Sequence, residues 1–189
     1  MHIRDLYKDR TLLKWLLSHG PSIREQPRPS IELAARHASL ETIRFLIDQG
    51  ASFEQTDAIV LAALGHIKGI PECLKVILLL SEHGVSVNAY HLQFHDEKEY
   101  MSMIGIRNRM KALHYASRGG KADLVGVLLA KGADQSPKTF DGKSPDDLAL
   151  ESGHTEIIRL LASNKVSEFL LRMLFMIIAV AGEHGFASW

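Results

Sequence analysis

Apolar and polar positions recur at a regular interval along the chain. Four helix-length apolar phrases end at a glycine, at residues 13–22, 43–52, 77–86 and 125–134. Their glycines are Gly20, Gly50, Gly84 and Gly132, which lie 30, 34 and 48 residues apart. A period of about 33 residues, with about 15 more between the last two units, predicts stacked structural repeats. Since one such unit cannot bury its own apolar face, the pattern predicts an elongated array with a long exposed surface.

Each unit divides into two predicted helices. In the second unit, the small residues Ala34 and Ala35 mark a short first helix, and Ile43 and Leu46 belong to a second helix with helical apolar spacing. Gly50 follows, and glycine accepts without steric cost the left-handed conformation that ends a helix. The sequence therefore predicts ten or so helices in antiparallel pairs, without substantial sheet and with the repeat glycines just past the second helices.

Motifs in the last two units resemble the ankyrin repeat. Leu113-His114-Tyr115-Ala116 matches its first-helix motif, and Gly132-Ala133-Asp134 matches its closing turn. In the fifth unit, SPDDLALESGHTEIIRLL, Ser144 suits the helix N-cap and Pro145 the first helical position. The resemblance spans roughly residues 10–162, four to five repeats, and implies an all-α solenoid of stacked antiparallel helix pairs with hairpin loops. It also implies that the histidines of these motifs, His114 and His154, are structural; Lys111 replaces the motif threonine, so the usual Thr–His bond should be absent.

Domain organisation follows from the repeats. We assign residues 1–164 to the array, with an insertion at 89–109, and residues 165–189 to a C-terminal apolar helix. Asn164 is the nearest residue to a helix stop in the last unit. The apolar run from 169 to 181 is shorter than the roughly 20 residues that a bilayer span needs. Three roles remain open for this apolar run: a cap on the last repeat, a partner-binding or membrane-surface helix, and a short membrane anchor.

Composition narrows the class of function. The chain has 189 residues and no net charge, with 22 basic and 22 acidic residues, so no overall field favours nucleic acid. Its one cysteine, Cys73, cannot form an internal disulfide and is expected to be a small buried hydrophobic residue. No secretory signal is evident, which favours an intracellular location, in cytoplasm or nucleus.

The insertion holds the candidate chemistry. His91, His95 and Glu99 recur every four residues, which on a helix would place two imidazoles and a carboxylate on one face as weak metal-ligand candidates. Neither a helix nor a fourth ligand is indicated, so no metal or other cofactor is predicted. Aromatic, methionine and arginine side chains in the same segment favour partner contact instead.

Two classes of function remain. The first is a non-catalytic module that binds a protein partner along its concave face and through the hairpin insertion. Its expected contact residues are Arg36, His37, Tyr90, Phe94, Tyr100, Arg107, Tyr115 and Arg118. The alternative is a small-molecule-binding protein or enzyme with a site between the insertion and the concave face, using residues such as Asp96 or Tyr100. No phosphate loop, nucleophile elbow or dinucleotide fingerprint supports that alternative.

Overall fold

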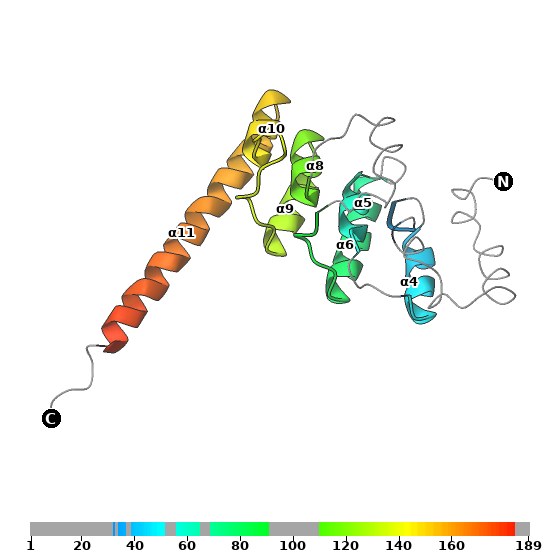
Figure 1. Ribbon diagram of the computed structural model, residues 1–189, viewed down its shortest axis with the longest axis horizontal. Helices are drawn as coiled ribbons and strands as arrows, with labels where there is room; N and C mark the ends of the chain where they lie inside the picture. The colour runs from blue at the N-terminus through cyan, green and yellow to red at the C-terminus, as the bar shows by residue number, and fades with distance from the viewer. Residues whose placement is uncertain are drawn as a thin grey trace, which may run out of the picture.

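The computed structural model describes residues 32, 34–36, 39–51, 56–64, 69–90 and 110–183 (Figure 1). Of residues 175 and 177–183 it describes only the backbone. The helices in chain order are α4 Leu40–Asp48, α5 Ala58–Leu64, α6 Ile70–Glu82, α8 Ala112–Arg118, α9 Ala122–Ala130, α10 Pro145–Glu151 and α11 Thr155–Glu183. Within these ranges the chain forms no strand, only an isolated antiparallel bridge between Tyr90 and Lys111.

The helices form two layers, as the repeat pattern predicts. The short first helices α5, α8 and α10 pack against one another in sequence order, and the second helices α4, α6, α9 and α11 do the same. Each first helix also packs against the second helix of its own unit, in the pairs α5–α6, α8–α9 and α10–α11. Figure 1 shows the pairs side by side along the long axis of the molecule. The all-α solenoid is confirmed.

The glycine stops are confirmed where the structure describes them. Gly50, Gly84 and Gly132 lie two residues past the ends of α4, α6 and α9 and have φ of 83°, 81° and 82°. In each case the backbone N–H after the glycine donates to a carbonyl four residues before the glycine, as in Val85 N–H to Leu80 O at 3.0 Å. These bonds satisfy carbonyls that the helix end would otherwise leave without a partner. Gly20 lies outside the described residues.

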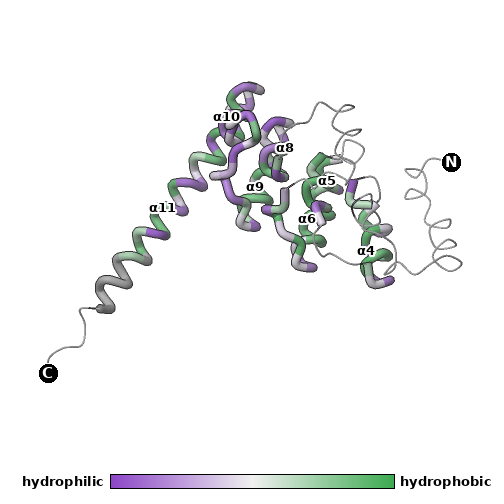
Figure 2. The backbone as a smooth tube through the Cα atoms, in the orientation of Figure 1, coloured by the Kyte–Doolittle hydropathy of each residue, from purple (hydrophilic) through white to green (hydrophobic). Residues whose placement is uncertain are grey.

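The core alternates small and large side chains. Fully buried alanines on the first helices, such as Ala62, Ala116 and Ala149, let neighbouring units approach closely. Larger fully buried side chains come mainly from the second helices and fill the space between layers; they include Ile43, Ile77, Leu80, Leu124, Leu128, Ile157 and Leu161. Figure 2 shows this apolar content running along α4 to α9. Cys73 is buried, and its Sγ donates to the carbonyl of Ala62 at 2.8 Å.

The C-terminal segment continues the last helix of the array. No helix end occurs at Asn164, because α11 continues without interruption from Thr155 to Glu183. Of the roles left open for this segment, contact with something outside the array fits the described side chains better than a cap does. Phe169, Leu170 and Met176 are about 60% exposed, and α11 extends away from the other helices (Figure 1). None of the described helices is both long enough and apolar enough to span a bilayer.

Candidate binding surface

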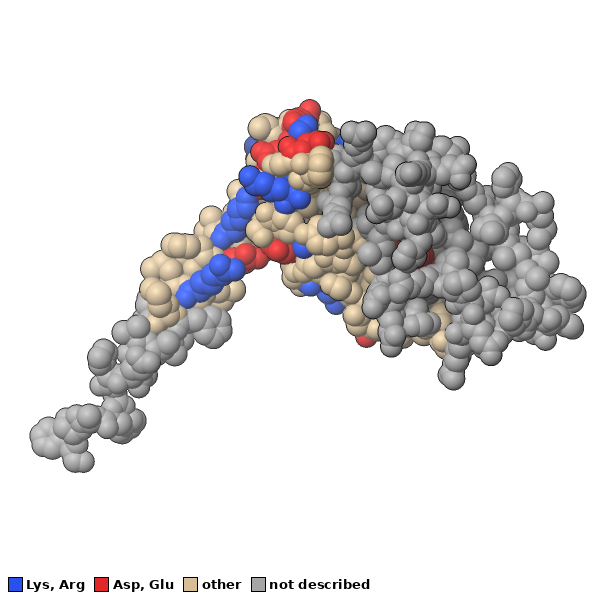
Figure 3. Space-filling model, in the orientation of Figure 1, with Lys and Arg blue, Asp and Glu red and all other residues tan. Residues whose placement is uncertain are grey.

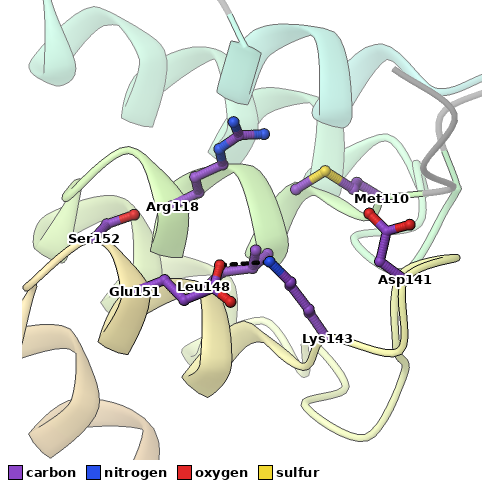
Figure 4. A pocket seen from close by; sticks show the side chains of 7 residues that line it. All are labelled: Met110, Arg118, Asp141, Lys143, Leu148, Glu151 and Ser152. Carbon is purple, nitrogen blue, oxygen red and sulfur yellow. Dashed lines mark hydrogen bonds and ion pairs between the residues drawn. The ribbon is translucent and has the colours of Figure 1, made fainter. Parts of the chain in front are cut away.

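A groove lies between α8, α10 and the hairpin that joins α9 to α10. Its volume is about 240 Å³, and it is lined by Met110, Arg118, Asp141, Lys143, Leu148, Glu151 and Ser152 (Figure 4). Lys143 Nζ and Glu151 Oε2 form an ion pair across it at 2.7 Å. Arg118 forms no ion pair with another described residue, so its guanidinium is available to an acidic or carbonyl group of a ligand.

The hairpin beside the groove is held in a defined turn. Thr139 N–H donates to Lys143 O at 2.9 Å, and Gly142 N–H donates to Thr139 O at 3.0 Å. Lys143 N–H also donates to the Thr139 hydroxyl at 3.1 Å. Gly142 has φ of 77°, a conformation that glycine adopts without strain. Phe140 is at the tip of this turn, next to Asp141, with 79% of its surface exposed.

The start of α10 fixes the far end of the hairpin. Ser144 is its N-cap and Pro145 its first residue, as the sequence predicts. Ser144 Oγ accepts from Asp147 N–H at 3.2 Å, while Ser144 N–H and Oγ donate to Asp147 Oδ2 at 2.8 and 2.7 Å. The side-chain bond and then the backbone bond from Ser144 hold the pKa of Asp147 below its usual value. Asp147 therefore stays ionised near the positive end of the helix dipole.

His114 ties the near end of the hairpin to α8. Its Nδ1 accepts from Lys111 N–H at 3.2 Å, so the proton is on Nε2, which donates to Pro137 O at 3.1 Å. The ring is fully buried, and this burial, more than the charge of Lys111, lowers its pKa, although the bond to Pro137 opposes the shift. The expected structural role of His114 is confirmed. The backbone N–H of Lys111 donates to its ring, where the motif would use a threonine hydroxyl.

Neighbouring hairpins are joined through Asn88. Its Nδ2 donates to Gly132 O at 2.9 Å, and its Oδ1 accepts from Asp134 N–H at 2.8 Å. Asp134 in turn accepts from the backbone N–H and the hydroxyl of Ser136, and these two bonds lower its pKa. The edge of the array that carries the hairpins is therefore cross-linked by polar bonds from the third unit to the fourth.

The base of the insertion is also fixed. Tyr90 and Lys111 form the antiparallel bridge, and the Lys111 ammonium lies 4.9 Å from the centre of the Tyr90 ring. Lys111 is only 7% exposed, so the aromatic face compensates part of the cost of burying its charge. Tyr90 and Lys111, which are 21 positions apart in the sequence, consequently lie side by side.

The predicted contact residues are distributed unevenly. Arg118 lines the groove, Tyr90 is 43% exposed at the base of the insertion, and Arg36 and Tyr115 are half-buried. His37, Phe94, Tyr100 and Arg107 lie outside the described residues, as do Asp96 and the metal candidates His91, His95 and Glu99. Across the ranges that the structure describes, no group of three or more His, Cys, Asp or Glu side chains could hold a metal ion. The roles of these residues stay predictions.

The sequence-based contact residues did not include Phe140. An aromatic residue directly before an Asp-Gly pair, between two lysines at 138 and 143, was the available signal. The Asp-Gly pair favours a tight turn, and a large apolar residue at a tight turn cannot reach the core. Lys143 and Glu151 were missed because their contact joins residues eight positions apart on a loop and a helix.

Comparison with known proteins agrees with this geometry. Residues 89–169 match a family described as ankyrin repeats (3 copies). The chain contains ankyrin repeats. It is also similar to a probable E3 ubiquitin-protein ligase, XBOS34, of Oryza sativa subsp. japonica, with 30% identity over 125 residues. That match covers 66% of this chain and 22% of the relative, so the chain corresponds to about a fifth of that protein's length.

The family match fits the described repeats. It includes α8, α9, α10 and the first part of α11, together with the hairpin between α9 and α10. Ankyrin repeats are protein–protein interaction modules, and the groove and the exposed hairpin tip lie within the matched residues.

Proposed function

We propose that this ankyrin array binds a segment of a partner protein at the groove between α8 and α10, with the tip of the 139–142 turn as the principal anchor. The observation that carries the proposal is the 79% exposure of Phe140 on a turn held by three hydrogen bonds. An aromatic side chain on a fixed turn has only two side-chain torsions to order on binding, and aromatic residues are enriched among the side chains that dominate the binding energy of interfaces.

The groove supplies polar recognition next to this anchor. Arg118 offers a cation without an ion pair among the described residues, while Lys143 is already neutralised by Glu151. Leu148 and Met110 contribute apolar lining. A partner segment with one apolar side chain near Phe140 and one carboxylate or carbonyl group facing Arg118 matches this arrangement. Residues 91–109, which follow Tyr90 in the sequence, stay a predicted contact segment for the same partner.

The groove suits a peptide segment better than a small molecule. Its volume of about 240 Å³ is below the roughly 300–1,000 Å³ of typical small-molecule sites. Four of its seven lining residues are charged, whereas ligand pockets are mainly apolar. The ligase name of the rice relative belongs to a protein of which this chain matches 22%, so we propose partner binding and no catalytic step.

The test compares partners captured from source cells by the full chain and by two variants, Phe140→Ala and Arg118→Glu. The matched control is Lys75→Glu on α6, which lies on the second-helix layer in a separate depression of about 420 Å³. We expect a partner that the wild type and Lys75→Glu retain and that both groove variants lose. In direct binding to that partner, Phe140→Ala should cost at least about 2 kcal/mol, as a hot-spot residue does. Equal retention by all four proteins would refute the proposed surface.

A further inference from the structure

The outer part of α11 carries a large apolar surface that the array does not cover. Its described apolar side chains are 40–62% exposed: Val166, Phe169, Leu170, Leu171, Met173, Leu174 and Met176. Taking roughly 200 Å² for a fully exposed side chain of this size, they leave on the order of 800 Å² uncovered. A typical monomer exposes apolar patches of about 300–600 Å², so this surface is unusually large.

The phase of the helix decides which way this surface faces. Ile157 and Leu161 are buried against the array, and Lys165, Glu168 and Arg172 follow at spacings of four, three and four residues. At 3.6 residues per turn, such spacings keep all five on one side of the helix. The side of α11 that is apolar within the array therefore becomes charged where the helix leaves it.

One ion pair shows that the charged stripe begins on the side facing the array. Lys165 Nζ forms it with Asp146 of α10. Glu168 and Arg172 continue this side of the helix by their spacing. Figure 3 shows charged side chains where α11 leaves the array and uncharged ones along much of its described outer part.

The apolar side chains consequently lie away from the array. Val166, Leu170 and Leu174 recur every four residues, Met173 follows Leu170 by three, and together they centre on the side opposite the charged stripe. The apolar arc spans roughly 220° of the helix circumference at about 100° per residue. Folding this arc back onto the array would require α11 to rotate by about half a turn, which would expose Ile157 and Leu161 and separate Lys165 from Asp146.

We propose that a second copy of this chain covers the arc, by pairing of the two α11 helices. The uncovered area is comparable to the roughly 800 Å² that each partner buries in a standard interface. Within the described arc only Ser167 is polar, so the arc has almost no group that would select a chemically different protein. An apolar surface of this kind is complementary to its own copy, which is the condition for a two-fold interface.

The charged stripe argues against a lipid surface as the occupant. Amphipathic helices that bind membranes carry a broad face rich in lysine and arginine. Here the stripe is narrow, it contains Glu168, and Lys165 is already paired with Asp146. The net charge of the whole chain is zero, so it adds no general attraction to anionic lipid.

The experiment is sedimentation equilibrium of the full chain over a wide range of protein concentration. We expect a mass twice that of the 21.1 kDa chain. The double variant Leu170→Glu/Leu174→Glu should raise the dimer dissociation constant by a factor of about 100 or more, because it places carboxylates inside the apolar contact. Arg172→Glu introduces the same carboxylate between those two positions, but on the stripe facing the array, and should leave the dimer intact.

The controls separate association from folding. All the substituted side chains are exposed, so the variants should keep the wild-type helical circular dichroism, and at concentrations where the wild type is itself monomeric they should keep its melting temperature. A wild-type chain that stays monomeric overturns the proposal, as does a double variant that dimerises as tightly as Arg172→Glu. The monomer is also mixed with vesicles of phosphatidylcholine and phosphatidylserine. Vesicle binding by a monomeric wild type would assign the arc to lipid instead.

Discussion

Replacement of Gly120 by alanine tests the junction between the fourth and fifth units. Gly120 has φ of 70° just after α8, and an added Cβ would lie 2.6 Å from Cε1 and 2.9 Å from Nε2 of His154. The His154 ring is held there by donation from Nε2 to Arg118 O at 3.3 Å. Gly132→Ala is the matched control, because Gly132 has φ of 82° and no neighbour within 4 Å of an added Cβ.

The expected magnitudes follow from these contacts. Gly132→Ala carries only the cost of a left-handed alanine, about 1–2 kcal/mol. Gly120→Ala carries the same cost and also displaces the His154 ring, which removes a hydrogen bond contributing about 0.5–1.5 kcal/mol and disturbs its packing. We therefore expect Gly120→Ala to lower the free energy of unfolding by at least about 1 kcal/mol more than Gly132→Ala does.

Urea denaturation followed by circular dichroism measures both costs. In a His154→Ala background the ring is absent, so the costs of the two glycine substitutions should become equal within about 0.5 kcal/mol. The reasoning fails if Gly120→Ala is no more costly than Gly132→Ala in the wild-type background. It also fails if the extra cost persists without the His154 ring.

Three further predictions concern the core, a buried histidine and the tail. Leu128→Ala, at a fully buried side chain between units, should cost about 2–5 kcal/mol in urea denaturation, and an unchanged midpoint would contradict the assigned packing. Burial lowers the pKa of His114 in the folded state below its value of about 6.5 in the unfolded state. The neutral ring therefore contributes its full stability above about pH 6.5, and this contribution is lost as pH falls through the folded pKa. Stability should therefore fall on acidification below about pH 6.5, and His114→Gln should reduce that dependence; an identical pH profile would refute the assignment. Truncation after Asn164 should leave the melting temperature within a few degrees of that of the variant Leu170→Glu/Leu174→Glu, which lacks the dimer contact, since the described side chains it removes are mostly exposed in the single chain, whereas a large drop below that variant would restore the capping interpretation.

Much of the fold could be predicted because repeats make local signals redundant. Each glycine stop and each small-residue first helix reports the same unit again, so a weak signal at one unit is supported by its neighbours. The N-cap at Ser144 was predicted from local helix-start signals, and the structural role of His114 from the resemblance to the ankyrin motif. The identity of the donor to His114 was not predicted, because side-chain motifs do not show that a backbone N–H takes the place of a missing hydroxyl.

The candidate surface was predicted less well. Arg118 was expected on the concave side, but its groove depends on where Lys143 and Glu151 meet, and that contact is set by the fold of the hairpin. Tyr115 was expected as a contact residue and is half-buried, packed partly against the core. Exposure of an aromatic side chain on a first helix depends on the side of the helix it occupies, which composition does not record.

The tail shows how much this helical phase decides. Interpreted by composition, the apolar residues after 165 resemble a cap, because a solenoid needs its last flank covered. Interpreted by phase, Ile157 and Leu161 define the side facing the array, and the residues that continue this side are Lys165, Glu168 and Arg172. A cap would continue the apolar side of its own helix, whereas this sequence changes sides within two turns. Moving the apolar side to the opposite face of α11 is unfavourable for packing the outer turns onto the same array. It is the arrangement needed by a helix whose inner turns pack within its own chain and whose outer turns pack against a second chain.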